Sequence, residues 1–114
     1  MGSKNKLKRF NENETFENVI QPTREEVTSG FKYQGKWSEF FGNNNPIVLE
    51  LGCGKGEYTV ALAQRNPNVN YIGIDIKGAR FWRGAKTATE ENIPNVAFVR
   101  TQIELVDFIF AENE

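Results

Sequence analysis

The chain has 114 residues, of which 39% are hydrophobic and 25% charged, and its formal net charge is −1. This length allows one domain, and the near-neutral charge provides no overall basic field for nucleic acid. The lack of histidine excludes Ser-His-Asp and Cys-His catalysis, and the single cysteine excludes an internal disulfide. No apolar run approaches the roughly 18 residues of a membrane helix, and no signal peptide is visible. We therefore expect a cytoplasmic protein with no membrane partner and no metal.

The first 46 residues show no clean periodicity. Residues 1–14 are predicted to be a flexible basic tail, because residues 1–9 contain four cations, no acid and little apolar surface. Residues 15–46 are an N-terminal extension rich in aromatic side chains. Within this extension, Trp37, Phe40 and Phe41 have the spacing of one face of a short helix, which the turn residues at 42–46 end.

The remaining residues, 47–114, alternate between strand and helix patterns. The almost continuous apolar run at 47–51 predicts a strand buried on both faces. The predicted strands are 47–51, 70–75 and 96–100, and the predicted helices are 57–65, 78–91 and 103–111. This order predicts an α/β fold with three parallel strands, the first half of a Rossmann-like domain. The first strand belongs at the centre of such a sheet. We expect it to be left as an open edge, and we interpret the chain as a fragment without the second half.

The strongest signal is a glycine cluster between the first of these strands and the following helix. Gly52, Gly54 and Gly56 occupy alternate positions there. Glycine permits positive φ and lets a ligand approach the backbone, and the adjoining helix N-terminus offers free N–H groups. The spacing matches neither a P-loop nor the dinucleotide fingerprint G-x-G-x-x-G. The alternative interpretation is a tight turn without a ligand.

Three polar residues at the ends of the three predicted strands favour a nucleoside. Glu50 would oppose the positive sulfonium and ammonium groups of S-adenosylmethionine and would repel a pyrophosphate. Asp75 lies 19 residues after Gly56, where α/β nucleoside sites place an acid that accepts hydrogen bonds from the ribose. Gln102 offers adenine both a donor and an acceptor. The alternatives are a helix-capping aspartate and a surface glutamine.

Two other features have less specific interpretations. Cys53 is expected to be a small residue that fits a crowded turn, because no histidine or second cysteine accompanies it. On the predicted helix at 78–91, Phe81 and Trp82 are expected to face the core, while the cations spread over the opposite side. That basic side either contacts an RNA backbone or is a solvated helix face.

Three segments together resemble the bacterial tRNA (guanine-N7-)-methyltransferase family. They are Leu49-Glu50-Leu51-Gly52-Cys53-Gly54-Lys55-Gly56-Glu57, Tyr71-Ile72-Gly73-Ile74-Asp75 and Asn95-Val96-Ala97-Phe98-Val99-Arg100-Thr101-Gln102. The resemblance covers roughly residues 15–114. It implies a class I methyltransferase fold in which S-adenosylmethionine is bound by Glu50, Gly52, Gly54, Gly56, Asp75 and Gln102. Asp75 stands where glutamate is frequent in the family, and Gln102 stands where aspartate or asparagine is frequent.

The resemblance also implies a reaction, the methylation of guanine N7 in the variable loop of tRNA. Guanine N7 has a lone pair and no proton to lose, so alignment of the two reactants supplies much of the acceleration and no histidine is required. The family's catalytic Phe-Pro-Asp-Pro segment would lie beyond Glu114. No catalytic residue is therefore assigned, and this chain alone is expected to be inactive. The alternatives are a class I methyltransferase for a small molecule and an inactive nucleoside-binding module.

Overall fold

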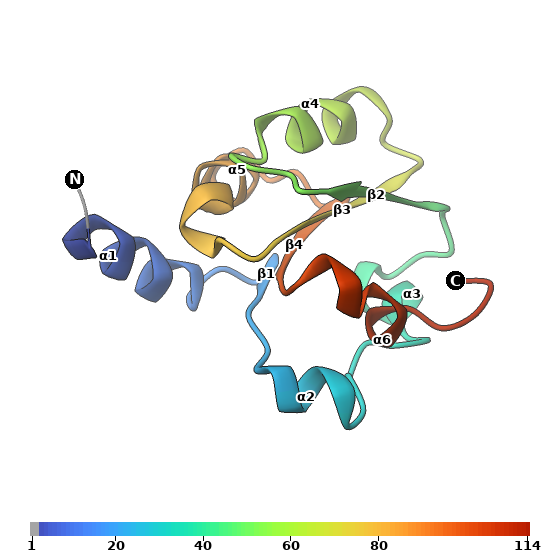
Figure 1. Ribbon diagram of the computed structural model, residues 1–114. Coiled ribbons are helices and arrows are strands. Elements are labelled where there is room, and N and C mark those ends of the chain that lie inside the picture. The colour runs from blue at the N-terminus through green and yellow to red at the C-terminus, as the bar shows by residue number, and fades with distance from the viewer. Residues whose placement is uncertain (1–2) are drawn as a thin grey trace.

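A parallel sheet with the strand order β1-β4-β3-β2 organises the protein (Figure 1). The computed structural model describes residues 3–114. The strands are β1 (Val19–Ile20), β2 (Ile47–Leu51), β3 (Asn70–Asp75) and β4 (Val96–Arg100). The helices are α1 (Ser3–Asn13), α2 (Arg24–Thr28), α3 (Trp37–Phe41), α4 (Glu57–Arg65), α5 (Gly78–Glu90) and α6 (Val106–Ile109), with a 3-10 turn at Ile103–Leu105. The predicted α/β fold with a parallel sheet is confirmed, and its three predicted strands have the predicted bounds.

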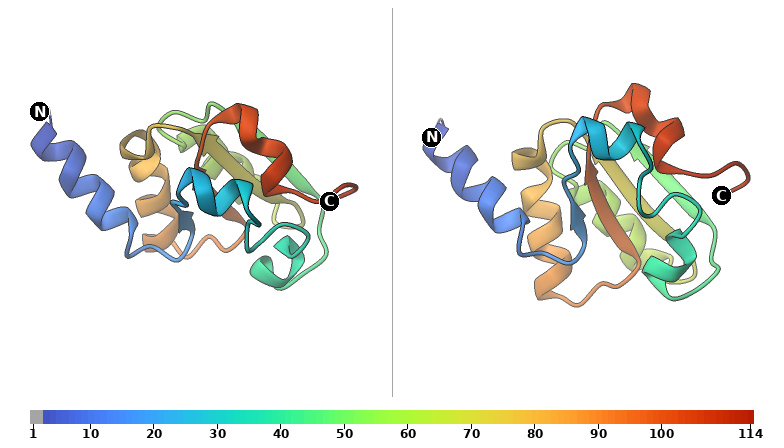
Figure 2. Two further views of the ribbon diagram at one scale, coloured as in Figure 1. Left: turned by 60° about the horizontal axis from the view of Figure 1, so that its bottom comes forward. Right: turned by 90° about the horizontal axis from the view of Figure 1, so that it is seen from below.

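The strand β3 is the centre of the sheet and is buried along its whole length. Its side chains point alternately to the two faces of the sheet and pack into two separate cores. Ile72 and Ile74 face the core beneath α2, α3 and α6, whereas Tyr71 faces the core beneath α4 and α5. Figures 1 and 2 show these two groups of helices on opposite faces of the sheet. The result is a three-layer arrangement in which the sheet lies between helices.

The strand β2 lies at the edge of the sheet, as expected, and pairs only with β3 within the described residues. The prediction that residues 47–51 are buried on both faces is wrong in this structure. None of the five is buried, and Val48 and Leu51 are 44% and 49% exposed. The reason is positional, because an edge strand lacks a neighbour on one side whatever its sequence.

The N-terminal segment contains a helix and a strand that were not predicted from the sequence. The short strand β1 pairs with β4, with Val19 opposite Phe98, and so adds a fourth strand to the three that were predicted. Residues 3–13 form the helix α1 instead of a flexible tail, and Asn13 donates a buried hydrogen bond of 3.0 Å to the carbonyl of Gly78. Residues 1–2 lie outside the described part of the chain. These contacts join positions far apart in sequence, which local patterns do not reveal.

Trp37 anchors the extension to the C-terminal end of the chain. It is fully buried, and its indole N–H donates to the carbonyl of Ile109 at 3.0 Å. Its ring lies between 5.2 and 6.1 Å from the rings of Phe31, Tyr33, Phe40, Phe41 and Phe110. The short helix predicted from the aromatic spacing is confirmed as α3, and this aromatic cluster is the reason that it forms.

Replacing Trp37 with alanine should lower the free energy of unfolding by about 3–5 kcal/mol, because large buried aromatic side chains leave a cavity of that cost. Urea denaturation of the full-length protein, meaning the complete protein that contains this chain, measures this change. The matched control is Tyr58→Ala, because Tyr58 is 64% exposed and surface substitutions usually change stability by less than about 0.5 kcal/mol. Equal effects of the two substitutions would contradict the anchoring role of Trp37.

Candidate nucleoside site at the glycine loop

The glycine loop, residues 52–56, connects β2 to α4 at the carboxyl edge of the sheet. Its glycines adopt positive φ angles of 71° at Gly52, 57° at Gly54 and 79° at Gly56, which side chains disfavour. The N–H groups of Gly52 and Cys53 both donate to the carbonyl of Ile74, at 2.7 and 3.1 Å. These bonds bend the loop over the end of β3.

The three glycines differ in their surroundings. A side chain at Gly56 would meet the ring of Phe98 at 2.7 Å, so packing alone requires glycine at that position. A Cβ atom built on Gly52 or Gly54 would meet no protein atom within 4 Å. The space above these two residues is therefore open. Their positive φ angles already favour glycine in a tight turn, and the open space in addition leaves room for a ligand beside the backbone.

The helix α5 presses directly on the glycine loop through Gly84. A Cβ atom there would lie 2.9 to 3.0 Å from the backbone atoms of Gly56. The N–H group of Gly84 also donates to the carbonyl of Lys55 at 3.0 Å. Gly84 was not among the predicted site residues, although a glycine in the middle of a predicted helix is a visible signal, because glycine weakens helices.

Asp75 lies at the end of β3, buried beside the loop with 8% of its surface exposed. One carboxylate oxygen accepts the N–H of Gly54 at 3.0 Å, and the other accepts the N–H of Lys77 at 2.9 Å. Asp75 thus fastens the loop to the start of α5, a role broader than the helix cap considered from the sequence. A carboxylate offers about four lone-pair positions, so acceptor capacity remains for a ligand.

Glu50 and Asp75 place negative charge around Cys53. Burial, reinforced by the charges of Asp75 and Glu50, raises the pKa of the Cys53 thiol to about 12. The thiol is therefore protonated at neutral pH and is a poor nucleophile, which agrees with the packing role predicted for it. The same negative environment favours a cationic ligand and opposes a pyrophosphate.

Gln102 lies just beyond β4, and its side chain has a partner that the sequence did not reveal. Its amide oxygen accepts a hydrogen bond of 2.6 Å from the guanidinium of Arg24, on α2. Because a guanidinium can only donate, the oxygen must face Arg24 and the NH2 group is left to donate elsewhere. Arg24 and Gln102 are 78 positions apart in the chain, so no local pattern could have paired them.

Exposed apolar side chains surround the same edge of the sheet. Leu51, Ile76 and Ile103 are 49%, 44% and 43% exposed, and they directly follow Glu50, Asp75 and Gln102. They were not among the predicted site residues, although their positions next to the three polar candidates are a visible signal in the sequence. Together with the polar groups, they give this edge the mixed polar and apolar character of a nucleoside site.

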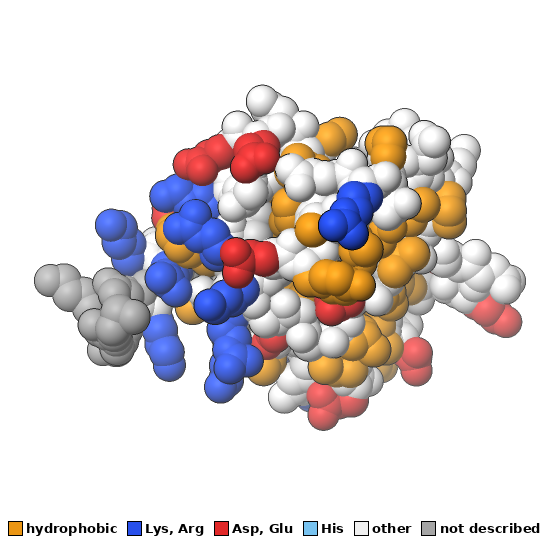
Figure 3. All heavy atoms as spheres, turned by 90° about the horizontal axis from the view of Figure 1, so that it is seen from above, with side chains coloured by type: hydrophobic (Ala, Val, Ile, Leu, Met, Phe, Trp, Pro, Cys, Tyr) orange, Lys and Arg blue, Asp and Glu red, His pale blue; other side chains and the backbone are white. Residues whose placement is uncertain are grey.

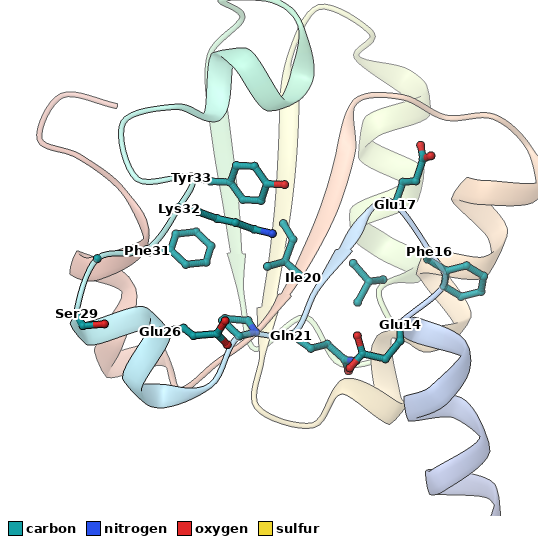
Figure 4. Close-up of a pocket in the computed structure, with 13 residues that line it drawn as sticks. Glu14, Phe16, Glu17, Ile20, Gln21, Glu26, Ser29, Phe31, Lys32 and Tyr33 are labelled. Atoms are coloured by element: carbon teal, nitrogen blue, oxygen red, sulfur yellow. The ribbon is translucent and has the colours of Figure 1, made fainter.

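A hollow of about 470 Å³ lies away from the glycine loop, along the N-terminal extension (Figure 4). Its lining comes from residues 14–33 and includes none of the predicted site residues. Across residues 3–114, no group of three or more potential ligand side chains could hold a metal ion, and no helix is both long and apolar enough to cross a membrane.

Solved structures of class I methyltransferases share this α/β fold, and they define the class of the protein. One, titled as an antibiotic related methyltransferase, is 27% identical with a TM-score of 0.55, covering 61% of this chain and 37% of that chain. The antibiotic-resistance methyltransferase Kmr shares the fold at 19% identity with a TM-score of 0.50, covering 75% of this chain and 37% of its own.

The chain belongs to the family described as putative methyltransferases, whose pattern matches residues 44–114. Among its relatives, a tRNA (guanine-N(7)-)-methyltransferase of Christiangramia forsetii is 73% identical over all of this chain and 52% of the relative. A protein of the same name from Porphyromonas gingivalis is 56% identical over 89% of this chain and 43% of its own length. The chain thus spans about half the length of the curated relatives it matches, and the family resemblance expected from the sequence is confirmed.

The contact between α5 and the glycine loop predicts an unusual response to Gly84→Ala. Alanine normally stabilises a helix interior by about 1 kcal/mol relative to glycine. Here we expect a net loss of about 1–3 kcal/mol, because the added methyl group would overlap the backbone of Gly56. Urea denaturation of the full-length protein measures the change. Thr89→Ala, at an exposed position of the same helix, should change stability by less than about 0.5 kcal/mol. A stabilised Gly84→Ala protein would contradict the close contact.

Proposed function

We propose that this chain supplies the cofactor-binding half of an S-adenosylmethionine-dependent tRNA (guanine-N7-)-methyltransferase acting in the cytoplasm. The observation that carries the proposal is the 73% identity, along the whole chain, to a relative of that name. The geometry of the glycine loop supports it independently, because its open space and negative charge suit this cofactor.

The glycine loop and the two carboxylates beside it fit the cationic part of S-adenosylmethionine. The open space over Gly52 and Gly54 would let the ligand approach the backbone. The carboxylates of Glu50 and Asp75, whose charges already act on Cys53, would attract the sulfonium and ammonium groups. A dinucleotide would bring a pyrophosphate into the same negative environment, so it is disfavoured.

The remaining site residues fit the adenosine part. Asp75 would accept hydrogen bonds from the ribose hydroxyls with the lone pairs that the loop leaves free. Gln102, held by Arg24 with its NH2 group outward, would donate to a ring nitrogen of adenine. Ile76 and Ile103, both more than 40% exposed, would cover apolar faces of the purine and be buried by it.

The cofactor would supply an activated methyl group on its sulfonium. The residues of this chain would hold and orient the cofactor, and they would exclude water from the apolar side of the site. The acceptor, guanine N7, attacks with its lone pair and releases no proton, so the reaction demands alignment more than acid–base catalysis.

Methyl transfer to unmodified tRNA tests the proposed function. The full-length protein, incubated with methyl-labelled S-adenosylmethionine and a tRNA transcript, should release labelled 7-methylguanosine after digestion to nucleosides. A transcript carrying 7-deazaguanine at the variable-loop position is the control, because it lacks the accepting nitrogen and should take up no label there. Labelling of a carbon or of another base, or no labelling of tRNA, would refute the assignment.

The ribose contact of Asp75 can be separated from its role in fastening the loop. Hydrogen bonds to charged groups contribute about 1.5–3 kcal/mol, so removing the ribose hydroxyls from S-adenosylhomocysteine should weaken its binding to the natural protein about 10- to 150-fold. Asp75→Ala should abolish most of this discrimination, whatever it does to stability. Calorimetry measures the affinities of S-adenosylhomocysteine and of its 2′,3′-dideoxy analogue for the natural protein and for the variant.

Asp107→Ala is the control for this experiment, because Asp107 is an exposed aspartate on α6. This variant should distinguish S-adenosylhomocysteine from its dideoxy analogue by the same factor as the natural protein. If Asp75→Ala still distinguishes the two ligands by the natural factor, Asp75 only fastens the loop.

A further inference from the structure

Lysine and arginine side chains gather over the end of the molecule that α1 and α5 form (Figure 3). This concentration contrasts with the formal net charge of −1 for the whole chain. Along α5, Arg80, Arg83 and Lys86 recur every third residue, and no acid occurs from Gly78 to Thr89. A helical spacing of three residues keeps all three cations on one side of the helix.

Trp82 organises the densest part of this surface. The guanidinium groups of Arg9 and Arg83 lie 4.6 and 4.8 Å from the centroid of its ring, and the ammonium of Lys86 lies 5.0 Å away. We call these four residues the Trp82 cluster. The expectation that Trp82 faces the core with Phe81 is wrong. Phe81 is fully buried, stacked on Phe98, whereas Trp82 is half-buried beneath cations.

The Trp82 cluster joins two helices into one surface. Arg9 belongs to α1, whereas the other three members belong to α5. Nearby, the indole N–H of Trp82 donates to the Glu12 carboxylate at 2.6 Å, and Asn13 donates to the Gly78 carbonyl. The cations therefore already lie together around one ring, which lowers the cost of gathering them when a ligand binds.

The charge of the Trp82 cluster is poorly balanced by its contacts. Three cations surround one ring, and among the described residues the carboxylate that accepts a hydrogen bond from this ring is that of Glu12. The negative face of the aromatic ring attracts the cations but does not neutralise them. A ligand with several closely spaced negative charges would relieve their mutual repulsion. Guanidinium groups also match phosphate with paired donors.

The basic surface continues toward the glycine loop. Gly84 contacts the loop backbone and bonds to the carbonyl of Lys55, an exposed lysine. On the other side, the guanidinium of Arg100, at the end of β4, lies 5.8 Å from the ring of Phe10 on α1. Positive residues therefore extend from the Trp82 cluster to the carboxyl edge of the sheet, where the methyl donor is proposed to bind.

We propose that the Trp82 cluster is a contact surface for the sugar–phosphate backbone of RNA, an inference that takes RNA as the polyanion from the proposed function. The cations bind phosphates and read no bases, because phosphate contacts position a nucleic acid without specifying its sequence. Trp82 does not stack on bases, since cations cover its ring. Its role is to hold the cations of two helices at a common spacing.

The double substitution Arg83→Gln and Lys86→Gln tests this surface in the full-length protein. Binding of an unmodified tRNA transcript, without cofactor, is measured by fluorescence anisotropy at several salt concentrations. Each phosphate contact contributes about 0.7–0.9 to the slope of log affinity against log salt. We expect weaker binding and a slope shallower by about 1.4–1.8 than that of the natural protein. Lys36→Gln with Arg65→Gln removes two cations from other elements and should leave both quantities unchanged.

A second variant, Arg9→Gln on α1, should make the slope shallower by about 0.7–0.9. Because Arg9 lies on another helix, a folding defect confined to α5 cannot explain its effect. Affinity for S-adenosylhomocysteine should be unchanged in all variants, which shows that the glycine loop is intact. Natural affinity and slope in the Arg83/Lys86 variant would overturn the proposal. So would a natural protein that binds anionic phospholipid vesicles but no tRNA. Normal tRNA binding by this surface without methyl transfer would refute the proposed function alone.

Discussion

Gly84 lies so close to the backbone of Gly56 that it has no room for a side chain, and a side chain at Gly56 would meet the ring of Phe98. This contact fixes the glycine loop against α5, and the ring of Phe98 closes it from the sheet side. Because protein interiors are close-packed, a loop held between α5 and Phe98 cannot shift without disturbing the core. The open space above Gly52 and Gly54 is therefore a fixed feature of the fold, as a binding site for a small cofactor requires.

The polar groups of the site depend on the same contact. Asp75 can bridge the N–H groups of Gly54 and Lys77 only because the loop and the start of α5 lie together at the end of β3. The aspartate in turn contributes to the field that holds Cys53 in its neutral form. One buried carboxylate thus connects loop geometry with local electrostatics, and a cationic ligand would benefit from both.

The N-terminal segment has a structural role on each side of this site. Its strand β1 continues the sheet beyond β4, and Trp37 covers one face of the sheet together with α6. Its helix α1 lies against α5 and brings Arg9 to Trp82. The site therefore sits between an aromatic anchor and a basic surface, and α5 is the element that touches both the loop and the basic surface.

The sequence by itself determined the parts of this protein that depend on local periodicity and on residue type. The strands at 47–51, 70–75 and 96–100, the helix at 57–65 and the positive-φ glycine loop follow from apolar runs and from the steric freedom of glycine, both of which act over a few residues. Family resemblance then led to the proposal that Glu50, Asp75 and Gln102 bind one ligand.

The tertiary structure alone decided the exposure of β2, the helix α1, the strand β1, the bond from Arg24 to Gln102 and the surroundings of Trp82. Each of these depends on contacts between residues far apart in the chain. Trp82 shows the reason most clearly. Its position on α5 indicated a core residue, yet α1 packs beside it and supplies Arg9 from 73 positions away. Helical spacing describes one helix, and only the packed structure determines what the second helix brings to it.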